Sequence, residues 1–344
     1  MNPDESAALH QAVVTVCSDV DGSGWHPNVW NALEQMGVTA LSVAEAAGGA
    51  GADLPAATTV LIALGLSGAS VPFVESDLVA GCLIEQAGLR MPQGAVTAAI
   101  ACDYELRRVR DGWLLSGVAP RVPWGRHSDW VVAVAKGADP QVVVLPTNGA
   151  EIRRGSNVAG EPRDDLVFVD RLLVPEAVRP VGEDAVAHAL RRGAFGRSAQ
   201  MTGAAQSVYQ QTVKYAGERH QFGRPLSAMP VVQQMLAELA EDVCSMTVAV
   251  EAAAGAAATR PQDAWVLDAA RVRVATSAAA VAAIGHQIHG AIGFTQEHPL
   301  HRATTRLWAW REEYGNAKTW SNHLGEELAG GGGGDWPLWH RLAL

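Results

Sequence analysis

The order of apolar and polar residues divides the chain into a helical part, a β part and a second helical part. In residues 1–90 apolar side chains recur at helical spacing, as in the segment from Val29 to Met36. From Gly94 to Pro180 short β-branched runs alternate with Gly, Pro and Asn, which is typical of strands and turns. Helical spacing returns at Ala185 and continues to Leu328.

The middle part carries a clear hairpin signal. Asp111 and Gly112 separate two strand-like runs between Val109 and Gly117, and Asp-Gly favours the tight turn that joins antiparallel strands. Further apolar β-branched runs cover residues 130–135, 141–145 and 166–169. The sequence therefore predicts a small antiparallel β domain or β-barrel.

The last part predicts three long helices over residues 189–218, 231–258 and 264–289, joined by short loops into an up-down bundle. We therefore expect an α+β protein that is mostly α, with domains at residues 1–93, 94–182 and 183–329. Residues 330–344 read as a glycine-rich spacer and a tail. Trp336 and Trp339 in this tail would be costly to expose, so the tail is expected to dock on a subunit.

Composition narrows the function classes. Only 18% of the residues are charged, which indicates that extra surface is buried against other subunits. The net charge of −10 and the lack of a lysine-rich tract argue against nucleic acid and anionic membranes as partners. The 4 cysteines form no Cys-x-x-Cys pair, and no apolar run approaches the ~20 residues of a membrane span. We expect a cytoplasmic protein.

Two motifs in the last part carry a family resemblance. Residues 215–226 read YAGERHQFGRPL, which is similar to the Tyr-Ala-x-x-Arg-x-Gln-Phe-Gly-x-Pro-Ile signature of the acyl-CoA dehydrogenase family. Residues 287–295, QIHGAIGFT, resemble the family's Gln-x-x-Gly-Gly-x-Gly-Tyr-Thr signature, with Ala291 in place of the second glycine. The order of helices, small β domain and four-helix bundle also resembles this family, over nearly the whole chain.

The resemblance implies that FAD is the cofactor. Arg219 would offer its guanidinium to the pyrophosphate of FAD, Gln221 would hydrogen-bond the cofactor, and Phe222 would cover an aromatic or ribityl face. In the family these groups reach a FAD held mainly by the neighbouring subunit. The resemblance therefore implies at least a dimer, either a homodimer or homotetramer or a heteromer with a second acyl-CoA dehydrogenase-like chain.

Three further residues of the second motif and one of the β part complete the expected cofactor site. Gln287, Gly290 and Gly293 would let the ADP half of FAD lie against the backbone. Trp124 loosely matches the β-domain stretch that faces the flavin, and a position in the core of the β domain explains it nearly as well.

The reaction implied by the resemblance is α,β-dehydrogenation of an acyl-CoA thioester. A carboxylate removes the α proton while a hydride passes from the β carbon to flavin N5, and electron-transfer flavoprotein is the expected acceptor. In the family the base is commonly a Glu directly before a Gly. Here Tyr314 precedes Gly315 and Glu313 falls one residue early, so either Glu313 is the base or the base is absent. Solvated carboxylates at a helix end explain Glu312 and Glu313 as well.

Three hypotheses follow. The chain is an acyl-CoA dehydrogenase with its own base, or a partner subunit that completes a FAD site without supplying the base, or a helical scaffold without a cofactor. No metal is expected: the four neighbouring histidines are split across a loop, and hydrogen-bonded or solvent-facing pairs explain them better than a ligand set. These histidines are His286, His289, His298 and His301.

Overall fold

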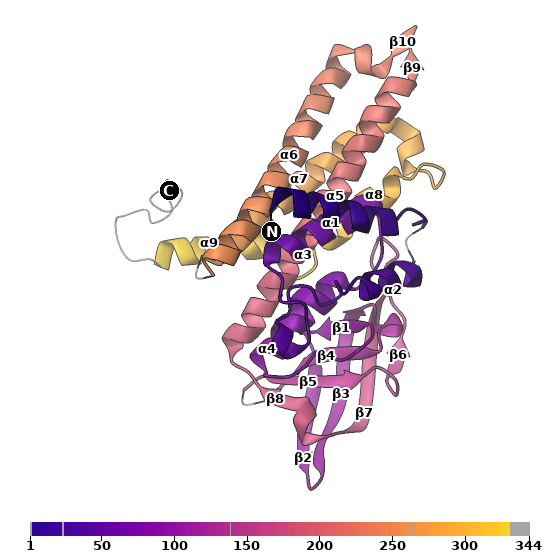
Figure 1. Cartoon of the computed structure of the whole chain (residues 1–344). Helices are drawn as coiled ribbons and strands as arrows, with labels where there is room; N and C mark the ends of the chain where they lie inside the picture. The colour runs from indigo at the N-terminus through magenta and orange to yellow at the C-terminus, as the bar shows by residue number, and fades with distance from the viewer. Residues whose placement is uncertain (1, 23, 138, 262, 331–344) are drawn as a thin grey trace.

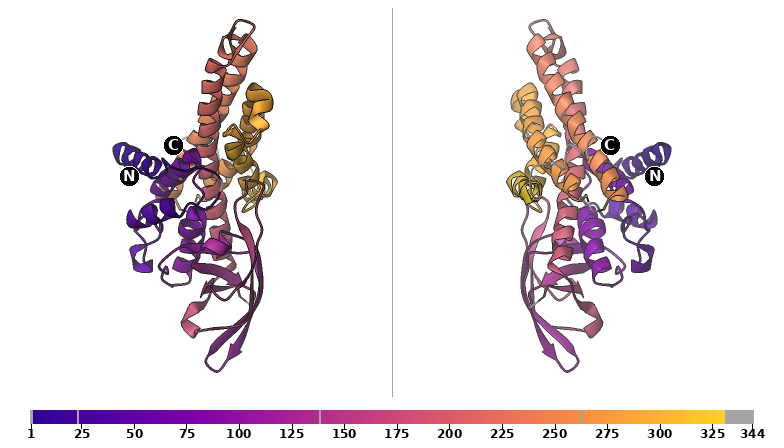
Figure 2. Two further views of the ribbon diagram at one scale, coloured as in Figure 1. Left: turned by 90° about the vertical axis from the view of Figure 1, so that its right-hand side faces the viewer. Right: turned by 90° about the vertical axis from the view of Figure 1, so that its left-hand side faces the viewer.

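The computed structural model describes residues 2–330, apart from residues 23, 138 and 262. Nearly all of the expected tail, with Trp336 and Trp339, lies outside the described residues. The described chain forms an elongated molecule with the β part at one end and a helical hairpin at the other (Figures 1 and 2). The N-terminal helices pack against one side of the long helix α5. The expectation of an α+β fold that is mostly α is confirmed.

The N-terminal part is a set of short helices that contact α5 over its middle. Asn2 caps the first helix, since its side chain accepts a hydrogen bond from the backbone N–H of Glu5 at 2.9 Å. Asp53 caps the third helix in the same way through the N–H of Ala56 at 3.0 Å. The elements are α1 (Pro3–Val16), α2 (Pro27–Gln35), η1 (Glu45–Ala47), α3 (Leu54–Ser67), the π-helical turn η2 (Val74–Ala80) and α4 (Gly81–Gln86).

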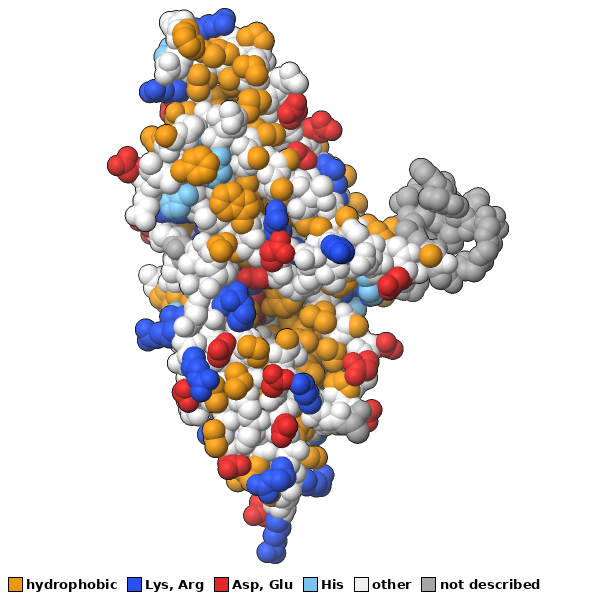
Figure 3. Space-filling view, turned by 180° about the vertical axis from the view of Figure 1, so that it is seen from behind, with side chains coloured by type: hydrophobic (Ala, Val, Ile, Leu, Met, Phe, Trp, Pro, Cys, Tyr) orange, Lys and Arg blue, Asp and Glu red, His pale blue; other side chains and the backbone are white. Residues whose placement is uncertain are grey.

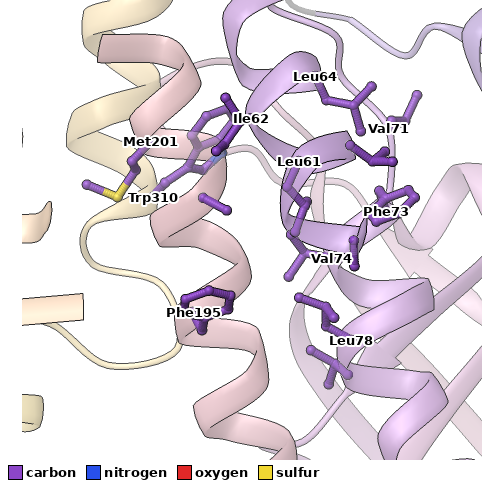
Figure 4. Packing of buried hydrophobic residues seen from close by; sticks show 14 of the residues in the cluster. Leu61, Ile62, Leu64, Val71, Phe73, Val74, Leu78, Phe195, Met201 and Trp310 are labelled. Carbon is purple, nitrogen blue, oxygen red and sulfur yellow. The ribbon is translucent and has the colours of Figure 1, made fainter. Parts of the chain in front are cut away.

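Helices α3 and α5 cross with their backbones almost in contact. A Cβ atom on Gly65 would lie 2.1 Å from the carbonyl oxygen of Gln200, and one on Gly203 would lie 2.0 Å from that of Ile62. Only glycine fits at these two positions. The crossing anchors a large apolar core that unites the N-terminal helices with the bundle, and Figure 4 shows part of it, including Leu61, Phe73, Phe195 and Trp310.

The β part consists of two sheets. One has the order β1-β4-β5-β8 and the other β2-β3-β7-β6. The hairpin predicted at Asp111-Gly112 is confirmed, because β2 and β3 pair antiparallel and Val109 faces Gly112. The strands are β1 (Val96–Ala99), β2 (Asp103–Val109), β3 (Gly112–Pro123), β4 (Trp130–Ala135), β5 (Gln141–Pro146), β6 (Glu151–Arg153), β7 (Arg163–Leu173) and β8 (Val178–Pro180).

Two details of the β part differ from the prediction. The strand β1 arrives from the N-terminal helices and runs parallel to β4, so the sheets are not purely antiparallel. The described strands do not close into a barrel, because they form two separate sheets with the edge strands β1 and β8 in one and β2 and β6 in the other. The two sheets meet through the isolated bridge between Glu105 and Lys136, and a separate apolar core that includes Tyr104 and Phe168 lies in this part.

The bundle contains the three long helices near the predicted bounds. The chain pairs α5 with α6 at the far tip of the molecule, where the short strands β9 (His220–Gln221) and β10 (Arg224–Pro225) form a hairpin (Figure 1). Among the described residues, none of the helices is long and apolar enough to cross a membrane. The helices are α5 (Glu183–Glu218), α6 (Pro230–Thr259), α7 (Trp265–His289), α8 (Leu300–Trp310) and α9 (Ala317–Gly330), and the 3-10 turn η6 (Gly290–Phe294) follows α7.

Candidate cofactor interface and active site

The first sequence motif forms the exposed tip of the α5–α6 hairpin. Arg219 is the C-cap of α5, and Phe222 and Gly223 make the turn between β9 and β10 with φ angles of +52° and +76°. Two successive residues with positive φ are typical of a tight hairpin turn. The side chains of Arg219, Gln221 and Phe222 are exposed, and Phe222 reaches 91%. Their groups are therefore free to contact something outside the subunit.

The second motif ends helix α7 and forms η6. Gly290 has φ +63°, and a Cβ atom built there would meet nothing within 4 Å, so its backbone faces open space. Gln287 is exposed next to it. Gly293 is buried instead. A Cβ atom built on Gly293 would lie only 2.9 Å from the Cβ atom of His289, so a side chain at this position would collide with α7. Gly290 thus offers an open backbone surface, whereas Gly293 allows η6 to pack onto α7.

The fold brings the two motifs to the same end of the bundle. The ring of Tyr215, one turn before Arg219, stacks on the ring of His289 with centroids 4.4 Å apart. The hydroxyl of Tyr215 also donates a hydrogen bond to the carbonyl oxygen of His289 at 3.4 Å. An exposed guanidinium and an open glycine backbone near each other suit an anionic, phosphate-bearing group.

An aromatic stack extends from η6 toward the middle of the molecule. His286 lies between Phe294 and Trp308, with ring centroids 4.1 Å and 5.6 Å apart. Phe294 is 68% exposed and Trp308 is 39% exposed. Seen from behind (Figure 3), hydrophobic side chains and histidines are exposed on the bundle, and a further hydrophobic region lies below them near the β part.

The expected histidine pairs have internal partners. The Nε2 atom of His286 lies 2.9 Å from the hydroxyl of Thr304, and the Nδ1–H of His289 donates to the carbonyl oxygen of Gly285 at 2.8 Å. Burial lowers the pKa of both imidazoles, which favours their neutral forms. Both rings act here as packing and stacking groups.

A cavity of about 610 Å³ lies between the β part and the bundle, and we call it the junction cavity. Its walls are mostly apolar, with Ile100, Val158 and Trp308 among them. The side chains of Arg163 and Glu313 reach its lining as well. The predicted base, Glu313, is therefore next to a cavity large enough for a ligand.

Glu313 does not present a free carboxylate to this cavity. Its Oε1 atom accepts hydrogen bonds from Arg163 Nη2 at 2.6 Å and from Asn157 Nδ2 at 3.2 Å. Its Oε2 atom accepts one from Arg197 Nε at 2.7 Å. Burial alone would raise the pKa of Glu313, but the two guanidinium groups and these hydrogen bonds lower it to about 2. Glu313 is an ionised, doubly paired carboxylate.

Glu313 belongs to a buried network of alternating charges. Arg163 also contacts Glu161 at 3.2 Å, and Glu161 contacts Arg306 at 3.3 Å. The network joins all three parts of the molecule, because one member comes from η2, two come from the β part and three come from the bundle or the turn after it. Its members are Glu75, Glu161, Arg163, Arg197, Arg306 and Glu313.

Sequence reasoning did not identify this network. Glu75, Glu161, Arg163, Arg197 and Arg306 are all at most 3% exposed. Buried charges of this kind persist only when they are paired. A signal was present in the sequence, since Arg197 stands in the middle of a helix among small and apolar residues that otherwise predict a core.

Tyr314 occupies the position directly before Gly315 where the family resemblance places the base. It has φ +54°, which is strained for a bulky residue. Its hydroxyl donates a hydrogen bond to Oε1 of Glu75 at 3.1 Å. Its ring lies against Gly193, where a Cβ atom would come within 2.8 Å of the ring. Glu312, the other carboxylate considered, is exposed and pairs with Arg311 at 2.8 Å.

Main-chain contacts hold the turn from Trp310 to Gly315. Arg271 of α7 is fully buried, and its Nη2 atom lies 2.9–3.0 Å from the carbonyl oxygens of Trp310, Arg311, Glu313 and Gly315. Burial lowers the pKa of Arg271 to about 10, so it remains charged at neutral pH. Arg271 therefore holds the backbone of the turn in addition to the contacts that the side chains of the turn make.

Trp124, the remaining predicted cofactor contact, lies in the interior. It is 2% exposed and does not line the junction cavity. Its ring packs 6.1 Å from that of Trp25, and the guanidinium carbon of Arg163 lies 5.9 Å from its centre. In this chain the ring of Trp124 therefore packs beside the guanidinium of Arg163.

Comparisons with known proteins agree with the geometry. A family model described as "Acyl-CoA dehydrogenase, C-terminal domain" matches residues 181–324. The acyl-CoA dehydrogenase IpdE2 of Mycobacterium tuberculosis is 28% identical over 288 residues, covering 81% of this chain and 79% of that protein. The acyl-CoA dehydrogenase FadE27 of the same organism is 27% identical over 338 residues, covering 88% of each chain.

A solved structure shares the whole fold. The ChsE4-ChsE5 complex from M. tuberculosis aligns with a TM-score of 0.85 at 22% identity, covering 97% of this chain and 99% of that chain. The fold is that of the acyl-CoA dehydrogenases, which are oxidoreductases. The chain thus matches the C-terminal domain of the acyl-CoA dehydrogenases over residues 181–324, and over most of its length it is similar to acyl-CoA dehydrogenases in sequence and fold.

Proposed function

We propose that this chain is one subunit of a heteromeric FAD-dependent acyl-CoA dehydrogenase in which a second chain supplies the base. The observation that carries the proposal is the position of Glu313 between Arg163 and Arg197. A general base works best with a pKa near the working pH, whereas the pKa of Glu313 is about 2. Tyr314, at the position expected for the base, carries no carboxylate.

The cofactor site would lie at the interface with that second chain. Arg219 would pair with the pyrophosphate of FAD, and Gln221 and Phe222 would contact the cofactor beside it. Gln287 and the open backbone of Gly290 would lie along its adenosine half, while Gly293 packs η6 in place. The exposure of the first five of these groups supports a cofactor approached from outside this subunit.

The overall reaction would be α,β-dehydrogenation of an acyl-CoA thioester, with electron-transfer flavoprotein as the acceptor. FAD, when bound, supplies the group that takes up the hydride. The role of this chain would be to hold the phosphate and adenosine part of FAD and to exclude water from the site. A precedent for a two-chain assembly is the solved ChsE4-ChsE5 complex of M. tuberculosis, which is named for two chains.

A second candidate is a homo-oligomeric dehydrogenase in which Glu313 is released and acts as the base. It is favoured by the fact that Glu313 lines the junction cavity and is 18% exposed. In that case Glu313 would have to leave two guanidinium groups when a ligand enters. This exchange is costly in a buried site.

Co-expression tests the proposal. The full chain is purified alone and together with candidate acyl-CoA dehydrogenase-like chains, and the visible spectrum and the activity on an acyl-CoA with an artificial acceptor are recorded. We expect flavin colour and activity in a co-purified complex, with activity largely kept in Glu313→Gln. If the chain purified alone contains flavin and is active, and Glu313→Gln abolishes that activity, the result would favour the second candidate, in which Glu313 is the base. If the chain stays colourless with every candidate partner, only the hypothesis of a helical scaffold without a cofactor would remain.

A further inference from the structure

The two cofactor motifs contact each other at His289, the last residue of α7. Its ring stacks on the ring of Tyr215, with an interplanar angle of 21° and centroids 4.4 Å apart. Its carbonyl oxygen accepts a hydrogen bond from the hydroxyl of Tyr215 at 3.4 Å. Tyr215 lies one turn before Arg219, and His289 directly precedes Gly290. His289 therefore holds the open glycine backbone in place relative to the helix end that carries Arg219.

The hydrogen bonding of His289 requires a neutral ring. Its Nδ1 atom lies 2.8 Å from the carbonyl oxygen of Gly285, and because a carbonyl oxygen can only accept, Nδ1 carries the hydrogen. Its Nε2 atom is buried and has no hydrogen-bond partner among the described residues. The residue as a whole is 3% exposed. A proton added at Nε2 would therefore create a buried cation without an acceptor, which is costly.

The surroundings of His289 do not favour a cation either. No carboxylate of the described residues forms an ion pair with its ring or with the imidazoles of His286 and His298, and η6 brings no charged side chain. Burial lowers the pKa of His289, and protonation of the neighbouring imidazoles would lower it further, against the hydrogen bond to Gly285, which raises it. The titratable groups of this cluster, besides His289, are Tyr215 from α5, His286 from α7, His298 from the loop before α8 and His301 from α8.

The lowered pKa sets the direction of the pH effect. In the unfolded chain an imidazole takes up a proton near the ordinary value of 6.5, whereas the folded state resists protonation of His289 to a lower pH. The contribution of the neutral ring is therefore complete above about pH 6.5 and is lost as the pH falls below it. To be hydrated, a protonated ring has to leave the stack on Tyr215, and this movement displaces Gly290 from its position relative to Arg219.

We propose that His289 is a positioning residue that joins the two cofactor motifs while its imidazole is neutral and releases them when it is protonated. The inference rests on the proposed function, which places FAD against Arg219 and Gly290. It adds a regulation of that site: the interface holds the phosphate and adenosine part of FAD at neutral pH and loosens in mild acid. The ring of His289 need not touch the cofactor, because it acts through Tyr215 and the backbone of Gly290.

The first test needs no cofactor. The full chain with isotope-labelled histidine is titrated by NMR, and the His289 signal is identified by its absence in His289→Phe. We expect its midpoint to lie below pH 6.5. Hydrogen-exchange protection of residues 290–294, corrected for the intrinsic pH dependence, should fall below that pH in wild type. It should stay level in His289→Phe, which keeps a stacking ring that takes up no proton. A midpoint at or above 6.5, or unchanged protection in wild type, would overturn the inference.

The second test measures the flavin retained by the co-purified complex after dialysis at about pH 7.5 and about pH 5.5. One coupled proton changes an affinity by at most about tenfold per pH unit, so the flavin retained by wild type should fall several-fold. His289→Phe should keep its flavin at both values, whereas His289→Ala removes the stack and should retain less than wild type at both. His10→Phe is the matched control and should follow wild type, because α1 packs against α2 and α3.

The failure of this inference is distinguishable from failure of the proposed function. Yellow complexes at neutral pH that lose flavin equally in wild type and His289→Phe would reject the role of His289 alone. A complex that is colourless at neutral pH with every candidate partner would reject the proposed function, and the NMR titration would still decide whether the ring is neutral. If His289→Phe does not fold, as judged by circular dichroism, His289→Gln replaces it. Its flavin content should not fall further in acid, and a fall equal to that of wild type would count against the inference.

Discussion

The Nη2 atom of Arg163 lies 2.6 Å from the Oε1 atom of Glu313, and this contact ties the first residue of β7 to the turn after α8. The Nε–H of Arg197 in α5 donates a hydrogen bond to the other carboxylate oxygen, Oε2, at 2.7 Å. Glu313 thus bridges the β part and the bundle through two cations that are almost fully buried. Its charge serves the junction between domains, and this role conflicts with that of a mobile proton acceptor.

Replacing Glu313 with Gln should therefore affect stability more than chemistry. The variant leaves Arg163 and Arg197 without their shared anion, and removing one partner of a buried ion pair costs about 3–5 kcal/mol. Urea unfolding measures this loss. Glu312→Gln is the matched control, because Glu312 is exposed and its change should stay within about 0.5 kcal/mol. Loss of turnover in Glu313→Gln with unchanged unfolding would contradict the structural role.

The same carboxylate should make the protein sensitive to acid. Its pKa in the folded state is about 2, below the ordinary value of 4.5, so the unfolded chain binds the proton more readily. Its contribution is complete above about pH 4.5 and is lost as the pH falls toward 2. We expect the free energy of unfolding to fall more between pH 7 and pH 3 in wild type than in Glu313→Gln. Equal decreases would show that Glu313 contributes nothing in this range.

Arg219→Gln should weaken flavin binding without destabilising the chain. Arg219 is exposed at the end of α5, and its side chain makes no hydrogen bond or ion pair with the other described residues. Its loss would therefore remove a cation that pairs with the pyrophosphate and leave the packing of the chain unchanged. The flavin content of the co-purified complex, read from its visible spectrum, should drop while the melting temperature stays the same. Arg224→Gln, on the same hairpin at an unspecified position of the family signature, should keep its flavin. If both variants keep the same flavin content, the proposed contact between Arg219 and the pyrophosphate would be contradicted.

Gly293→Ala should destabilise the packing of η6 on α7. The new Cβ would lie 2.9 Å from the Cβ of His289 and 3.1 Å from Cδ2 of Leu300, and overpacking of this kind costs about 1–3 kcal/mol. Gly255→Ala is a control in α6, where a Cβ meets nothing within 4 Å. That change should be neutral or stabilising by up to about 1 kcal/mol. Thermal unfolding compares the two, and a lower melting temperature for Gly255→Ala alone would contradict the packing argument.

Much of the fold could be predicted because local patterns agree with it. The Asp111-Gly112 hairpin and the three long helices follow from turn chemistry and helical spacing, which the tertiary structure leaves unchanged. The closed barrel, one of the two forms predicted for the middle part, is not formed, because closure depends on pairing between distant edge strands and the described strands make two separate sheets. The parallel pairing of β1 with β4 depends on where the N-terminal helices deliver the chain, which local sequence does not encode.

Residues of the candidate site could be proposed from the sequence only where a motif marked them. Tyr215 against His289 explains how two motifs far apart in sequence meet at one end of the bundle. The state of Glu313 could not be read from its neighbours in sequence, because its partners Arg163 and Arg197 lie 150 and 116 residues away. Such a network arises only when three separate parts of the chain pack together.

The contacts of Arg271 with main-chain oxygens have a consequence for substitutions in the loop from Trp310 to Gly315. Because carbonyl groups between Trp310 and Gly315 are held by a guanidinium from α7, part of what fixes the course of this loop does not depend on the side chains that the loop carries. A side chain of this loop can thus be exchanged while Arg271 continues to hold the main chain around it, even where the exchange costs stability elsewhere.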